Sequence, residues 1–125
     1  MAVKSGPEGL TISLQVDQIL GEYCKELSEE VDKAARGTAA ATANYLKKHS
    51  PRGASLKHYA DGWKSKRLAK RNYTVYNATK PSLTHLLNNG HEKANGTGVV
   101  KGDDHITKAD EWAEKEFMKK VEKIL

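Results

Sequence analysis

The sequence is poor in the residues that form disulfides, metal clusters and large aromatic cores. Cys24 is the single cysteine of the 125 residues, so no internal disulfide can form and no CxxC motif exists. We interpret Cys24 as a packing residue, because it lies within a helical pattern of apolar positions. No apolar run approaches a membrane span, and the first residues lack the hydrophobic centre of a signal peptide. We therefore expect no contact with a membrane.

Large aromatic side chains are scarce as well, with one Phe and two Trp in the whole chain. A chain of 125 residues suffices for one compact domain, and we predict a single domain spanning 1–125. Its core should be thin and built mainly from Leu, Val, Ile, Ala and Tyr. A thin core gains stability when identical neighbours bury further surface. Residues 1–11 are polar and rich in glycine, and we expect a mobile arm or a short edge segment there.

The basic residues are concentrated in one segment. The formal net charge is +5, and six of the basic residues lie between Lys57 and Arg71 with Asp61 as the single acid among them. Such a patch can attract nucleic acid or an acidic protein, or it can simply keep a strand soluble. The residues of this candidate basic patch are Lys64, Lys66, Arg67, Lys70 and Arg71.

The apolar spacing predicts an α+β fold. Apolar or small residues recur every three or four positions from Leu14 to Leu46, which predicts one long N-terminal helix with a possible kink at Gly37 and an end at Ser50-Pro51. Residues 59–68 and 72–78 each contain aromatic and β-branched residues flanked by polar ones, which predicts two strands of an antiparallel hairpin joined near residues 70–72. We expect Trp63 to face the core and the lysines beside it to face solvent.

The second half of the chain predicts two helices and a further strand. Residues 81–90 indicate a short middle helix that Gly90 ends, followed by a glycine-rich loop and a strand at Val99-Val100. The C-terminal segment has an apolar stripe of helical period, with Thr107 as its expected N-cap. The small antiparallel sheet should therefore comprise the hairpin plus a further strand, backed by the helices.

Three of the five histidines raise the question of a zinc site, namely His85, His91 and His105. A gap of six residues places His91 off the helix face of His85, and no carboxylate in the short helix supplies a base. We instead expect His85, Leu86 and Leu87 to form the inner face of the short helix, with His85 bonded to backbone and His91 fixing the following loop. No nucleophile elbow or P-loop occurs. We predict no enzyme, no cofactor and no metal.

Two other function classes stay open from the residues alone. Trp63, Tyr73 and Tyr76 interleave with basic residues, a composition that can stack bases and contact phosphates in a nucleic-acid-binding module. A small nuclease of the toxin type, or a metal protein, is the third class, because such sites are assembled in space and leave no local signature.

A series of short motifs nevertheless resembles a known family. In order they are Ser50-Pro51-Arg52-Gly53, Tyr59-Ala60, Trp63-Lys64, Val75-Tyr76-Asn77, Leu83-Thr84-His85-Leu86-Leu87 with Gly90-His91, and His105-Ile106 with Ala109. Their order and spacing, over most of the chain, resemble the small tailed-phage neck and tail-completion proteins, also called head-tail joining or minor tail proteins. Two departures stand out: Asn88 replaces a frequent acidic residue, and residues 53–56 replace a Thr-Gly pair followed by Leu or Tyr.

The resemblance implies assembly rather than chemistry. Similar proteins occupy the junction of head and tail, and related tail terminators form rings, commonly hexamers, that end the tail tube and present a docking surface. The implied partners are copies of the chain itself, the tail-tube protein, the head-completion or stopper protein and, through the basic patch, the genomic DNA in the channel. The implied location is the virion, after assembly in the host cytoplasm.

Overall fold

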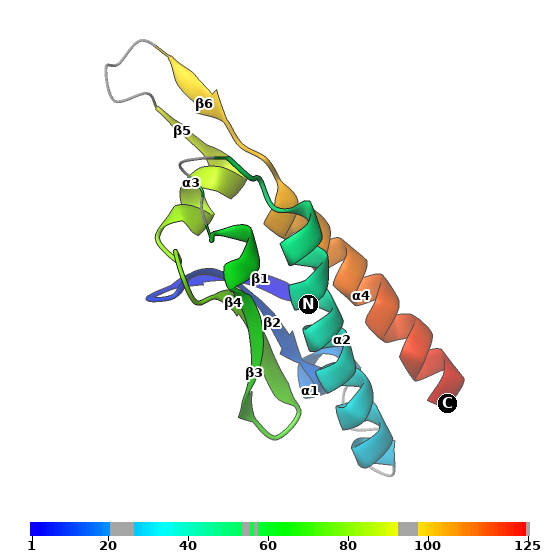
Figure 1. Cartoon of the computed structure of the whole chain (residues 1–125). Coiled ribbons are helices and arrows are strands. Elements are labelled where there is room, and N and C mark those ends of the chain that lie inside the picture. The colour runs from blue at the N-terminus through cyan, green and yellow to red at the C-terminus, as the bar shows by residue number, and fades with distance from the viewer. Residues whose placement is uncertain (21–26, 54–55, 57, 93–97, 125) are drawn as a thin grey trace.

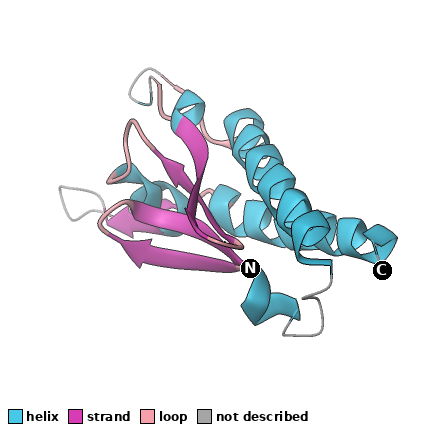
Figure 2. Cartoon of the chain, turned by 90° about the horizontal axis from the view of Figure 1, so that it is seen from below, coloured by secondary structure: helices cyan, strands magenta, loops and turns pink. Residues whose placement is uncertain are grey.

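The chain folds as an α+β domain in which helices back a four-stranded antiparallel sheet (Figure 1). The computed structural model describes residues 1–20, 27–53, 56, 58–92 and 98–124. The strand order is β1-β2-β4-β3, and the strands are β1 (Ala2–Gly6), β2 (Gly9–Gln15), β3 (Trp63–Ala69) and β4 (Asn72–Asn77). Figure 2 shows both long helices on one side of this sheet, which confirms the predicted fold class.

The N-terminal segment is part of the sheet, so the prediction of a mobile arm over residues 1–11 was wrong. It forms the β1–β2 hairpin, with Ala2 opposite Ser13 and Gly6 opposite Gly9. Leu10, Ile12 and Leu14 of β2 are buried, because alternate side chains of a strand share one face. The alternative of an edge segment is the correct one, since β1 is the edge strand.

The long N-terminal helix begins later than its periodicity indicates. Leu14 lies in β2, the short helix α1 (Val16–Leu20) follows, and α2 spans Ser28–His49. The residues predicted to belong to the first turns of the long helix include Cys24, which lies outside the described residues. The helix α2 passes Gly37 without a break and ends where Ser50 turns to extended backbone before Pro51.

The core lies between the sheet and a closely packed helix pair, α2 and α4 (His105–Ile124). The buried side of α2 is lined by small residues such as Ala35, Ala39 and Ala43, which let α4 approach closely. Phe117 and Val121 of α4 fill the space opposite. None of the described helices combines the length and the apolar character that a membrane span requires.

The predicted β3–β4 hairpin is confirmed. Trp63 faces Asn77 across it and is completely buried, as expected. The turn falls at Lys70 and Arg71, and Arg71 takes a positive φ of 58°. The register shifts between Arg67 and Ala69, a bulge that leaves Leu68 56% exposed.

The short middle helix and its strand are also present, in a different arrangement from the one expected. The helix α3 spans Leu83–Asn89 and ends at Gly90, whose φ of 82° suits a glycine. The strand β6 (Val99–Lys101) pairs with β5 (Gly90–Glu92) in a separate two-stranded sheet rather than joining the main one. Figure 1 shows this β5–β6 hairpin extending away from the body of the domain. A three-residue helical turn, η3 (Ala60–Gly62), precedes β3.

Candidate functional site

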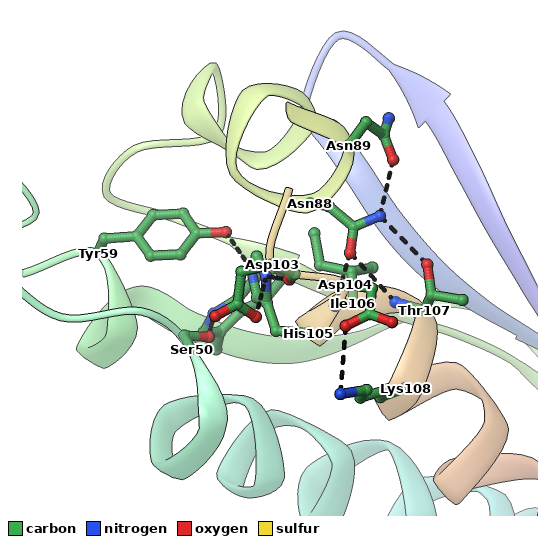
Figure 3. A network of polar contacts seen from close by, with 11 residues as sticks. Ser50, Tyr59, Asn88, Asn89, Asp103, Asp104, His105, Ile106, Thr107 and Lys108 are labelled. Atoms are coloured by element: carbon green, nitrogen blue, oxygen red, sulfur yellow. Dashed lines mark hydrogen bonds and ion pairs between the residues drawn. The ribbon is translucent and has the colours of Figure 1, made fainter. Parts of the chain in front are cut away.

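Several of the family-like motif residues meet in the interior. His105, 2% exposed, sits at the start of α4 with its Nε2 2.7 Å from the Tyr59 hydroxyl and its Nδ1 2.7 Å from the Asp103 carbonyl oxygen (Figure 3). A carbonyl can only accept, so Nδ1 carries the proton and Nε2 accepts the hydroxyl hydrogen. Burial lowers the pKa of His105 and, with Asp103, raises the pKa of Tyr59. The pair is therefore neutral.

The two rings joined by this hydrogen bond pack against a third ring, that of Trp63. Tyr59, Trp63 and His105 contact each other edge to face, with centroids 5.9, 5.7 and 6.3 Å apart. The Trp63 indole donates to the Ser50 hydroxyl at 2.8 Å, which joins the end of α2 to β3. Asn77 extends the network, because its amide nitrogen donates to the Tyr59 carbonyl at 2.8 Å. The cluster thus ties the end of α2, the hairpin and the start of α4 together.

Asn88 of α3 caps the helix α4. Its Oδ1 accepts the backbone N–H of Ile106 at 2.9 Å and of Thr107 at 3.3 Å, and its Nδ2 donates to the Thr107 hydroxyl at 3.2 Å (Figure 3). The first N–H groups of a helix lack partners within it, and Asn88 supplies them from another element. The prediction that Thr107 is the N-cap was wrong, since α4 starts two residues earlier at His105.

The helix α3 turns polar side chains inward, contrary to the expected apolar inner face. Thr84 and Asn88, four residues apart, are its buried residues, and the Thr84 hydroxyl accepts the N–H of Leu10 at 2.7 Å. Leu87 packs against the core at an intermediate depth, whereas Leu86 is 42% exposed. The prediction for Leu86 was wrong because the inward positions of this helix go to residues that satisfy backbone N–H groups.

The histidines weighed as zinc ligands have separate surroundings. The Nε2 of His85 lies 3.2 Å from the Ser5 hydroxyl in β1, a side-chain partner in place of the expected backbone one, and both nitrogens of His105 are occupied by hydrogen bonds. His91 lies in β5, and its side chain is outside the described part of the structure. Among the described residues, no three His, Cys, Asp or Glu side chains gather closely enough to hold a metal ion.

The basic patch is divided between two surfaces. Lys64 and Lys66 lie on the sheet face opposite Trp63, where Lys66 pairs with Glu8 at 2.6 Å and covers the Tyr76 ring at 4.5 Å. The hydrogen bond to Glu8 raises the pKa of Lys66. The other members, Arg67, Lys70 and Arg71, line a cleft against α2.

The cleft side of the patch gains cations that the linear sequence did not group with it. Lys33 and Arg36 of α2 face the turn of the β3–β4 hairpin across this cleft. Arg71 binds the carboxylate of Asp17 through two nitrogens, at 2.8 and 3.1 Å, and this hydrogen bonding raises its pKa. A helical spacing of three places Lys33 and Arg36 on one face, but only the packing of α2 on the hairpin brings that face to Arg67.

Comparison of the chain with protein-family models, with curated proteins and with solved structures finds no match.

Proposed function

We propose that the chain is a structural protein of the tailed-phage neck, a tail-completion protein that closes into a ring and ends the tail tube. The proposal rests on the motif resemblance and on where the motif residues lie. Ser50, Tyr59, Trp63, Asn77 and His105 form interior hydrogen bonds. Buried, hydrogen-bonded side chains stabilise a fold and are not exposed to a substrate. This burial supports a role in assembly rather than in catalysis.

The observation that carries the proposal is the open edge of β1. All five residues from Ala2 to Gly6 are exposed, and within the described residues only β2 pairs with this strand. The strand has no proline and no bulge, and Lys4 is its single charge. A regular, unprotected edge of this kind is a template for a strand of another chain. The opposite edge, β3, is protected by a bulge and by lysines.

The direction of the backbone groups on β1 can be assigned. The backbone N–H of Leu10 donates to Thr84 and therefore points away from β1. Because backbone groups alternate in direction along a strand, the N–H and C=O groups of even-numbered residues in β2 point away from β1, and those of odd-numbered residues bond to β1. Lys4, opposite Thr11, therefore belongs to the ladder, whereas Val3, opposite Ile12, turns its N–H and C=O to the open edge.

A second, different surface is the projecting β5–β6 hairpin (Figure 1). An isolated two-stranded hairpin is marginal in water, so a contact with a neighbouring subunit would stabilise it. The β1 edge and the β5–β6 hairpin are two different surfaces. When one surface of each subunit binds the other surface of the next, the subunits form a closed ring if the rotation between neighbours closes. We propose a homo-oligomeric ring, a hexamer by the resemblance, which docks onto the tail-tube protein and the head-completion protein in the virion.

Two proline substitutions in β1 test the proposal. Val3→Pro removes one outward N–H and leaves the β1–β2 ladder intact, so the fold should lose less than about 1 kcal/mol while self-association is abolished. Lys4→Pro is the matched control, since it removes a ladder N–H and should cost about 2 kcal/mol or more. Mass photometry would read the assembly and circular dichroism the melting. A Val3→Pro protein that still assembles like the wild type would refute the role of this edge.

A further inference from the structure

A cleft of about 300 Å³ lies between the first half of α2 and the turn of the β3–β4 hairpin. Among the described residues, five cations line it: Lys33 and Arg36 from α2, and Arg67, Lys70 and Arg71 from the hairpin. Two carboxylates, Glu29 and Asp32, share the lining, which leaves a surplus of three positive charges. Asp17, which binds Arg71, reduces this surplus to two, compared with a formal charge of +5 for the whole chain.

One of the two acids of the cleft, Asp32, is partly committed to another group. Asp32 accepts the Tyr73 hydroxyl at 2.9 Å through Oδ2, which anchors it at the base of the cleft beside β4. Burial and this hydrogen bond raise the pKa of Tyr73, and the charges of Arg67 and Arg36 oppose the rise.

Four of the cations are available to a ligand. Arg71 is held by Asp17, whereas the remaining four make no ion pair within the part of the chain that the structure describes. Arg67 donates only to the backbone carbonyl of Ala69, at 3.3 Å. All four are exposed: Lys33, Arg36, Arg67 and Lys70.

We propose that this cleft binds the phosphodiester backbone of nucleic acid, independently of sequence. Solvated, exposed cations gain little from pairing with a single carboxylate or a small anion. Against a polyanion they gain more, because each neutralised phosphate releases condensed counterions. This favours nucleic acid over an acidic protein segment. The described residues that line the cleft include no aromatic side chain and no side-chain amide for reading bases, so their contacts would position the strand without selecting its sequence.

The residues proposed to contact phosphate differ from the basic patch that was predicted from the sequence. Lys64 and Lys66 belong to the other face of the sheet and take no part, while Lys33 and Arg36 replace them. This difference supplies a matched control, because Lys64 lies on the same strand as Arg67, is exposed and has the same charge. The site also does not depend on ring formation, and the Val3→Pro protein should retain it.

Fluorescence anisotropy with a short labelled duplex tests the site. Four phosphate contacts predict that affinity falls about 150-fold between about 50 and 200 mM salt, and about 40-fold once one contact is removed. Arg67→Ala and Arg36→Ala should each weaken binding and reduce the salt slope by about one. Arg67→Lys should keep both, and Lys64→Ala should stay within about twofold of the wild type. Melting curves would verify that every variant is folded.

Three results would overturn the proposal. The first is a wild-type protein that does not bind the duplex at low salt. The second is an equal loss with Lys64→Ala and Arg67→Ala, which would indicate diffuse charge rather than a cleft. The third is displacement of the duplex by poly-glutamate at lower concentration than by unlabelled duplex, which would identify an acidic protein as the ligand. Binding by the Val3→Pro protein would support the cleft even if ring formation failed.

Discussion

The cap that Asn88 provides to α4 predicts a large effect from a single polar residue. In Asn88→Ala the N–H groups of Ile106 and Thr107 lose their acceptor, and the N–H of Ile106 stays buried. Loss of an N-cap side chain costs about 1 kcal/mol, and a buried donor without a partner adds about 1–2 kcal/mol. We expect the free energy of unfolding to fall by about 2–3 kcal/mol.

The size of the domain converts this loss into a shift of the melting temperature. A domain of 125 residues shifts by about 4 °C per kcal/mol, so Asn88→Ala should melt about 8–12 °C below the wild type. Thermal unfolding followed by circular dichroism measures this shift, with urea titration giving the free energy.

Two variants isolate the cap from other effects. Asn88→Asp keeps an acceptor at the start of the helix and adds a charge that the helix dipole favours, so it should recover most of the loss although it forfeits the amide donor. Asn89→Ala removes an exposed acceptor of the Asn88 amide nitrogen, at 2.9 Å, but leaves the capping oxygen of Asn88 in place, so it should cost less than about 1 kcal/mol. The proposed cap is wrong if Asn88→Ala and Asn89→Ala have the same melting temperature, or if the melting temperature of Asn88→Asp is no higher than that of Asn88→Ala.

Two further predictions concern the core and its pH dependence. Trp63→Ala should cost about 3–5 kcal/mol, whereas Leu86→Ala should cost less than about 1 kcal/mol because its side chain is 42% exposed; equal urea midpoints for the two would refute the orientation of α3. The folded pKa of His105 lies below its ordinary value, so the unfolded chain takes up a proton that the folded chain refuses as pH falls below about 6.5. Stability should therefore decline from pH 7 towards pH 5, and His105→Gln, although less stable at pH 7, should show a shallower decline; parallel curves would contradict the buried neutral pair.

The sequence predicted those elements whose signals are local. The strands β3 and β4 are rich in aromatic and β-branched residues, among them Trp63, Tyr73 and Val75, and the helix α4 carries an apolar stripe from Ile106 to Val121. Strand-favouring residues and a helical period are both local signals.

The first strands were missed because two periods overlap at the junction of β2 and α1. Leu10, Ile12 and Leu14 follow the strand period, and Val16 with Ile19 or Leu20 continues them at helical spacing. A window starting at Leu14 therefore favours a helix. Gly9 was the available signal, since its φ of 77° and the nearby Pro81 carbonyl leave no room for a side chain in the β1–β2 turn.

The roles of Asn88 and of the basic cleft could not be read from local patterns. Asn88 acts 18 residues away in sequence, on a helix that meets α3 only in the folded domain. The alternation of β3 did separate Lys64 from Arg67, but the addition of Arg36 required the packing of α2 on the hairpin.

Imaging of the purified wild-type chain by negative-stain electron microscopy, with native mass spectrometry of the same sample, tests the proposed ring most directly. The account predicts closed rings of one copy number, held by the β1 edge and absent from the Val3→Pro protein. A wild-type chain that stays monomeric at every concentration tested, or that forms only two-fold symmetric dimers, would contradict it.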